Sequence, residues 1–138
     1  MLRASLFILL LSSTINAYSN QAEPLTIRLL QMTDSSCSNN YTNTDITIPD
    51  GCIQYQIHLS NTFPEVLRNL SIVSKIPQYT HLQQTPLLII NDQPPQKVTY
   101  SIQQHPEQDG DTLRMTLKEL HPTTEQATII QYSVKIDE

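Results

Sequence analysis

Hydrophobic and polar residues alternate along most of the chain. In the segment 52–60, an apolar side chain occupies every second position, at Ile53, Tyr55, Ile57 and Leu59. The positions between them are mostly polar. Because successive side chains of an extended strand point to opposite faces, this period of two predicts a β-strand with one face in the core.

The same alternation recurs in five other segments, and one further segment is a short continuous apolar run. The alternating segments are 25–30, 70–76, 98–103, 113–118 and 129–136, and the continuous run is 86–91. No stretch has the helical period of 3.6, and Thr, Ile and Val prevail over the strong helix formers. Clusters of Pro, Gly, Asn and Asp separate the segments. We therefore expect about seven strands in an antiparallel β-sandwich.

The chain has only two glycines, and each follows an aspartate, at Asp50-Gly51 and Asp109-Gly110. Glycine accepts positive φ without a steric penalty, so we expect both to be turn positions. Two glycines are too few for a phosphate-binding loop or a dinucleotide-binding fingerprint. No cofactor is predicted.

The first residues have the layout of a secretory signal peptide. Arg3 provides a positive start, residues 4–11 are the apolar run ASLFILLL, and Ala17 is a small residue at the expected cleavage point. We predict cleavage after Ala17, with Ala22 as the alternative. The apolar run is shorter than the roughly 20 residues that span a membrane, so we expect no stable membrane insertion after cleavage. Residues 18–138 then form one domain.

If the protein is exported, its two cysteines are expected to be oxidised. In an oxidising compartment, we expect Cys37 and Cys52 to form a disulfide, which closes a loop and stabilises the fold by about 3 kcal/mol. The alternative is a reactive thiol, which needs a histidine close by. His58 lies about 20 Å from Cys52 along the same predicted strand, which favours the disulfide.

The charge of the chain disfavours one class of partner. The full sequence has 8 Lys and Arg against 13 Asp and Glu, for a net charge of −5. Removing the signal peptide removes Arg3 and makes the net charge −6. An acidic protein gains no affinity from phosphate contacts, so we expect no nucleic-acid partner.

Three motifs resemble a bacterial Ig-like surface-repeat family, a conserved repeat domain of unknown function. Residues 48–61 (IPDGCIQYQIHLSN) match its opening strand, and residues 69–77 (NLSIVSKIP) match its second motif, with Ser74 in place of an aspartate. Residues 120–137 (LHPTTEQATIIQYSVKID) match its closing motif, with Thr123-Thr124 where the family has glycine. The resemblance covers residues 44–137 in a single copy. It implies an Ig-like sandwich of secreted or cell-surface proteins, and no catalytic site.

Few residues suggest chemistry. The four histidines, His58, His81, His105 and His121, do not pair at metal-ligand spacing, and we expect them on the surface. Asp109 and Asp111, with Glu107, could supply oxygens to Ca²⁺, but the spacing is that of a tight hairpin turn rather than of a dedicated calcium loop. No catalytic or metal residue is predicted. Asn40 and Asn69 begin N-glycosylation sequons, which we interpret as chance.

The preferred hypothesis is an exported, non-enzymatic binding or structural domain at the bacterial cell envelope, periplasmic or at the cell surface, with a protein partner that remains unknown. Its contacts would come from loops or an edge strand, and the segments to test are 61–67, 78–85 and 103–112. The first alternative is an exported enzyme or inhibitor with a site near His81, His105 or Asp111. The second is a periplasmic assembly factor that binds by β-strand addition, with 86–91 as its exposed edge.

Overall fold

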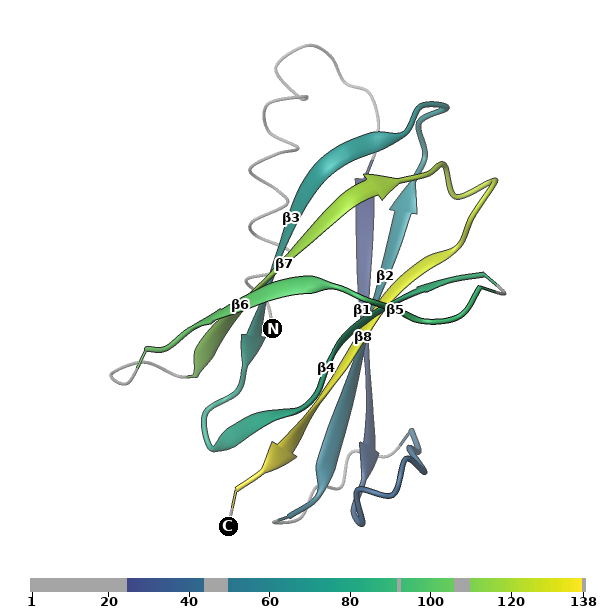
Figure 1. The fold of residues 1–138 in the computed structure, drawn as a ribbon. Helices are drawn as coiled ribbons and strands as arrows, with labels where there is room; N and C mark the ends of the chain where they lie inside the picture. Colours follow the sequence, from purple (N-terminus) through teal and green to yellow (C-terminus); the bar gives the residue numbers. More distant parts are fainter. Residues whose placement is uncertain (1–24, 44–49, 92, 106–109, 138) are drawn as a thin grey trace.

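The computed structural model describes residues 25–43, 50–91, 93–105 and 110–137. These residues form eight antiparallel strands in two sheets, with no helix (Figure 1). The prediction of an antiparallel β-sandwich is confirmed. The expected signal peptide and its cleavage site lie outside the described residues.

The larger sheet has five strands and the smaller has three. In spatial order, the larger contains β1 (Leu25–Asp34), β2 (Cys52–Asn61), β8 (Thr128–Ile136), β4 (Thr80–Ile90) and β5 (Gln96–Lys97). The smaller contains β3 (Leu67–Ile76), β7 (Asp111–Leu120) and β6 (Thr99–Gln103). β1 pairs with β2 along its full length, from Leu25 opposite Asn61 to Asp34 opposite Cys52.

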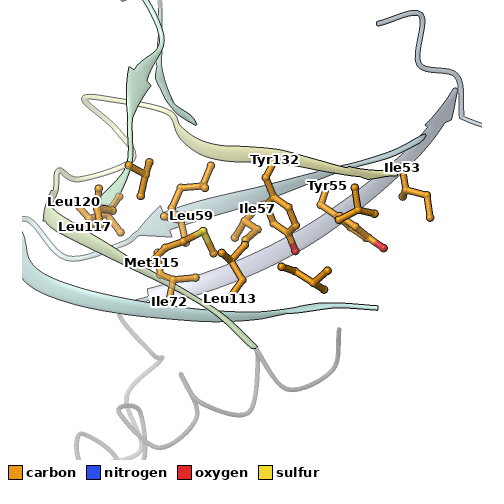
Figure 2. Packing of buried hydrophobic residues seen from close by; sticks show 14 of the residues in the cluster. Ile53, Tyr55, Ile57, Leu59, Ile72, Leu113, Met115, Leu117, Leu120 and Tyr132 are labelled. Atoms are coloured by element: carbon orange, nitrogen blue, oxygen red, sulfur yellow. The ribbon is translucent and has the colours of Figure 1, made fainter. Parts of the chain in front are cut away.

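The core lies between the two inner faces and follows the alternation of the sequence. β2 contributes Tyr55, which packs on Tyr132 of β8 with the ring centroids 5.2 Å apart. Figure 2 shows these rings beside aliphatic side chains from both sheets. The residues that are at most 2% exposed include Ile57, Leu59, Ile72, Ile76, Leu113, Met115, Leu120, Ile130 and Val134. Most polar residues between these positions lie on the outer faces, as the period of two requires, but Ser133 of β8 is buried as well.

Three of the six described strand pairs enclose one another along the sequence, whereas the pairing of β4 with β8 crosses that of β3 with β7. β2 pairs with β8, β3 pairs with β7, and β4 pairs with β5 inside them. In immunoglobulin domains the last two strands are neighbours in one sheet, whereas here β7 and β8 belong to different sheets.

Two local features differ from the sequence expectations. β4 begins at Thr80 rather than at Pro86, so most of the segment 78–85 is strand and not loop. Residues 80–85 (THLQQT) contain a single aliphatic residue, Leu82, so no alternation revealed this part of the strand. The pairing of β4 with β8 shifts register on both sides of Gln84. At the first Asp-Gly pair, Asp50 has the positive φ (66°), whereas Gly51 does not; at the second, Gly110 has φ of 101°.

Candidate functional site

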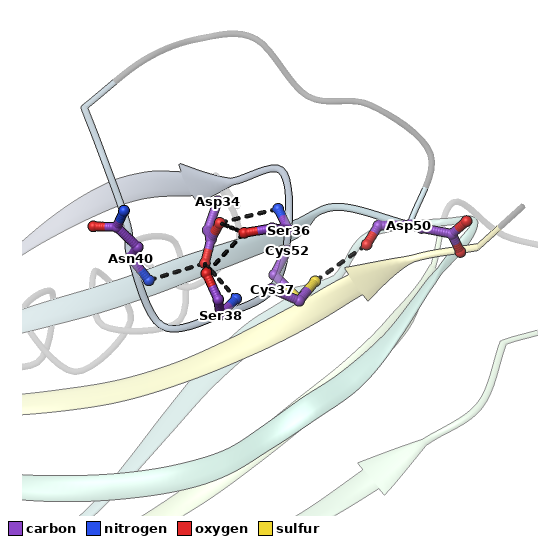
Figure 3. Close-up of a disulfide and its surroundings, with 7 residues drawn as sticks. All are labelled: Asp34, Ser36, Cys37, Ser38, Asn40, Asp50 and Cys52. Atoms are coloured by element: carbon purple, nitrogen blue, oxygen red, sulfur yellow. Dashed lines mark hydrogen bonds between the residues drawn. A yellow bond between two sulfur atoms is a disulfide. The ribbon is translucent and has the colours of Figure 1, made fainter.

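The disulfide joins the loop after β1 to the first residue of β2. Cys37 and Cys52 are bonded, with their Cα atoms 5.1 Å apart, which confirms the predicted pairing (Figure 3). No cysteine is free. The bridge is compatible with an oxidising, exported location.

One carboxylate organises the same loop. Asp34, at the end of β1, accepts hydrogen bonds from the backbone amides of Ser36 (3.0 Å), Ser38 (2.7 Å) and Asn40 (2.9 Å). Figure 3 shows the loop wrapped around this side chain. The Asn40 amide, helped by the Ser36 and Ser38 groups, lowers the pKa of Asp34 from 3.8 to about 2 against the opposing effect of burial. Asp34 is therefore a structural residue, and Asn40 of the first sequon is fixed by its backbone in this loop.

The histidines make local contacts. His81 Nδ1 lies 2.7 Å from Asp137 Oδ1 on the surface, and His121 Nε2 lies 4.0 Å from Glu119 Oε2. His58, on the outer face of β2, lies 3.3 Å from Gln56, and its pKa is lowered by partial burial and then by Arg28. Within the described part of the chain, no three His, Cys, Asp or Glu side chains are placed to hold a metal ion.

The surroundings of His105 and Asp111 form only a small hollow. The backbone amide of His105 donates to Asp111 Oδ1 (3.2 Å), and its ring Nε2 lies 3.0 Å from Thr112 Oγ1. The hollow that both residues line has a volume of about 160 Å³, and His81 is not among its lining residues. Glu107 and Asp109, the other two acids weighed as oxygen donors to Ca²⁺, lie outside the described residues.

The turn after β2 is built around a buried asparagine. The Asn61 side chain, 1% exposed, donates to the carbonyl oxygens of Glu65 (2.8 Å) and Leu120 (3.0 Å) and accepts from the Phe63 amide (3.0 Å). Its backbone amide donates to Thr123 Oγ1 (2.7 Å). Segment 61–67 is therefore tied to the end of β7 by these hydrogen bonds.

The distinctive surface is the free edge of the smaller sheet, which we call the open edge and define as β6. Tyr100 lies opposite Met115 and Ile102 opposite Leu113, both buried, so the two β6 side chains share the inner side of the sheet. They are nevertheless 39% and 41% exposed, because no described strand lies beyond β6. The alternation of segment 98–103 predicted burial for both, and this prediction holds only for Val98, which is 7% exposed.

The open edge lacks the usual protection against strand pairing. Natural edge strands carry charges, prolines, bulges or very short lengths that discourage a neighbour. β1 contains Arg28, β3 contains Arg68 and Lys75, and β5 is only two residues long. The free stretch of β4 contains Pro86 and the register shifts. Among the described edge strands, β6 (TYSIQ) is the one with neither charge nor proline.

A cleft, which we call the edge cleft, begins where β6 starts. It has a volume of about 620 Å³ and lies between the two sheets, bounded by β4 and β5 on one side and by β7 on the other. β6 pairs only with residues 112–116 of β7, so the stretch 117–120 has no described partner on that side. The apolar lining is Leu88, Ile90, Val98 and Leu117; amides and hydroxyls come from Gln93, Gln96, Gln126, Thr99 and Thr116.

The apolar run 86–91 is not the exposed edge that the sequence suggested. Its residues Leu87 and Leu88 pair with β8 on one side and with β5 on the other. Pro86 is fully buried, and its carbonyl accepts the Val98 amide (3.2 Å). The features of the open edge escaped the sequence analysis because alternation says which face of a strand is apolar but not which strand lies beside it.

No family model, curated protein or solved structure matches the chain. Among the described residues, no helix is long and apolar enough to cross a membrane.

Proposed function

We propose that the chain is an exported, non-enzymatic binding domain of the bacterial cell envelope that takes up a partner protein along the open edge. The observation that carries the proposal is the half-exposed pair Tyr100 and Ile102 on an uncharged strand with no described neighbour. A strand added beside β6 would satisfy its free backbone groups and cover both side chains.

The surroundings of Asp34, Tyr55 and Tyr132 give these three ionisable groups a structural role. Asp34 is committed to its loop, and burial raises the pKa of the core residue Tyr55 to about 12. Burial also raises the pKa of Tyr132 well above its usual value. Groups held in this way serve the fold, because a catalytic acid or base needs a pKa near the working pH.

The test is capture of the partner from envelope extracts by the exported protein and two matched variants. Ile102→Lys places a charge on the open edge, and Leu30→Lys places one at a comparably exposed apolar position (36%) on β1. We expect a specific protein, identified by mass spectrometry, to be retained by the parent and by Leu30→Lys and lost from Ile102→Lys. Equal retention by both variants would exclude the open edge.

A further inference from the structure

The charged residues of the edge cleft indicate which kind of ligand the cleft can bind. Among the described residues that line it, three carry a fixed charge: Lys97 of β5, Lys118 of β7 and Glu119 of β7. The carboxylate of Glu119 is 2.9 Å from Arg68 Nη1 and 4.0 Å from His121 Nε2. Because Arg68 balances Glu119, the two exposed lysines leave the cleft positive.

The positive charge of Lys97 and Lys118 is opposite in sign to the net charge of the whole chain, which is −5. Charges more than about 8 Å away are largely screened at physiological salt, so a group in the cleft responds mainly to Lys97 and Lys118. The cleft is thus complementary to an anionic ligand even though the protein is acidic.

The remaining lining favours a peptide. Leu88, Ile90 and Leu117 offer apolar contacts, whereas a comparable number of amides and hydroxyls surround them. An acyl chain would displace water from those polar groups without replacing its hydrogen bonds, which is costly. An extended peptide can use them for its main chain. The stretch 117–119 of β7, which pairs with β3 but has no described strand on its other side, provides further backbone groups.

We propose that the edge cleft binds an extended segment of the partner protein in which apolar residues alternate with Asp or Glu. The apolar side chains pack between the sheets on Leu88, Ile90 and Leu117, and the carboxylates face Lys97 and Lys118. This inference rests on the proposed function, since it assumes that a protein strand is added on this side of the sandwich, and it specifies the chemistry of that strand.

The first test is selection of short random peptides, displayed on phage, against the exported, disulfide-bonded protein. We expect the enriched peptides to alternate apolar and acidic residues. Enriched peptides without an acidic excess would overturn the inference and leave the proposed function standing. The absence of any enriched peptide would overturn both.

The second test measures the affinity of the best acidic peptide by calorimetry. Reversing both lysines, in Lys97→Glu with Lys118→Glu, should weaken binding by about ten-fold or more and reduce its dependence on salt. The matched control reverses Arg28 and Lys135, outside the cleft, and should leave the affinity within about two-fold. Equal effects in both variants would contradict the inference. Tighter binding of dodecanoate than of the peptide, abolished by the same lysine reversals, would replace it with an acyl ligand.

Discussion

At the scale of single residues, Gly110 is a position where the backbone conformation leaves no room for a side chain. Its φ of 101° is one that L-residues rarely adopt, and a Cβ would overlap the carbonyl oxygen of Ile76 and lie 3.0 Å from the Gln78 nitrogen. Gly110→Ala should therefore lower the free energy of unfolding by about 2 kcal/mol or more, measured by urea denaturation. Asp50→Gly, at a φ of 66° that glycine accepts readily, is the control and should change the stability little. A similar loss in both variants would contradict this account.

Ionisation of Asp34 makes the folding stability depend on pH. Its pKa is about 2 in the folded protein against an ordinary value of 3.8, so the ionised carboxylate stabilises the fold above pH 4. That contribution is lost as the pH falls from about 4 towards 2. Asp34→Asn keeps one acceptor oxygen but cannot ionise. Urea denaturation at several pH values should show the parent more stable than the variant at pH 6 and the two converging towards pH 2; a constant difference would be contrary evidence.

At the scale of elements, a hydrogen bond between two side chains joins β8 to β3 inside the core. The hydroxyl of Tyr132 on β8 lies 2.5 Å from the hydroxyl of Ser74 on β3, and both residues are buried. The sequence marked Ser74 only as a departure from a family motif, because alternation cannot show which polar residue of one strand meets a tyrosine of another.

A double-mutant cycle measures this bond. Tyr132→Phe leaves the Ser74 hydroxyl without its partner and should cost about 1–2 kcal/mol of unfolding free energy. Ser74→Ala in the same background should cost less than it does alone, with a coupling of about 1 kcal/mol. Strictly additive losses would show that the two hydroxyls do not stabilise each other.

The disulfide ties β1 to β2 through the loop that Asp34 organises. Replacing both cysteines, in Cys37→Ala with Cys52→Ala, frees a loop whose ends are 15 residues apart and should lower stability by about 3 kcal/mol. Chemical unfolding of the variant and of the reduced parent should give the same loss. A loss below about 1 kcal/mol would mean that the hydrogen bonds of Asp34 hold the loop without the bridge.

At the scale of the whole molecule, the sequence predicted the two-layer architecture and most of the strands, but not the order of the strands within each sheet. Strands such as β2 and β8 were predictable because one face had to be apolar, and the disulfide was predictable from two cysteines in an exported chain. The neighbours of each strand were not predictable, since many orders bury the same faces. Tyr100 and Ile102 show the consequence: their pattern is that of core residues, and only the absence of a further described strand exposes them.

The central claim, that the open edge is the surface that binds a partner, is tested most directly by site-specific photo-crosslinking in the protein's own cells. A photoreactive residue replaces Ser101 on β6 or, as the control, Thr26 on β1; both positions are exposed. The account predicts one discrete crosslinked adduct from position 101 and none from position 26. An adduct from position 26 alone, or the same adduct from both positions, would contradict it.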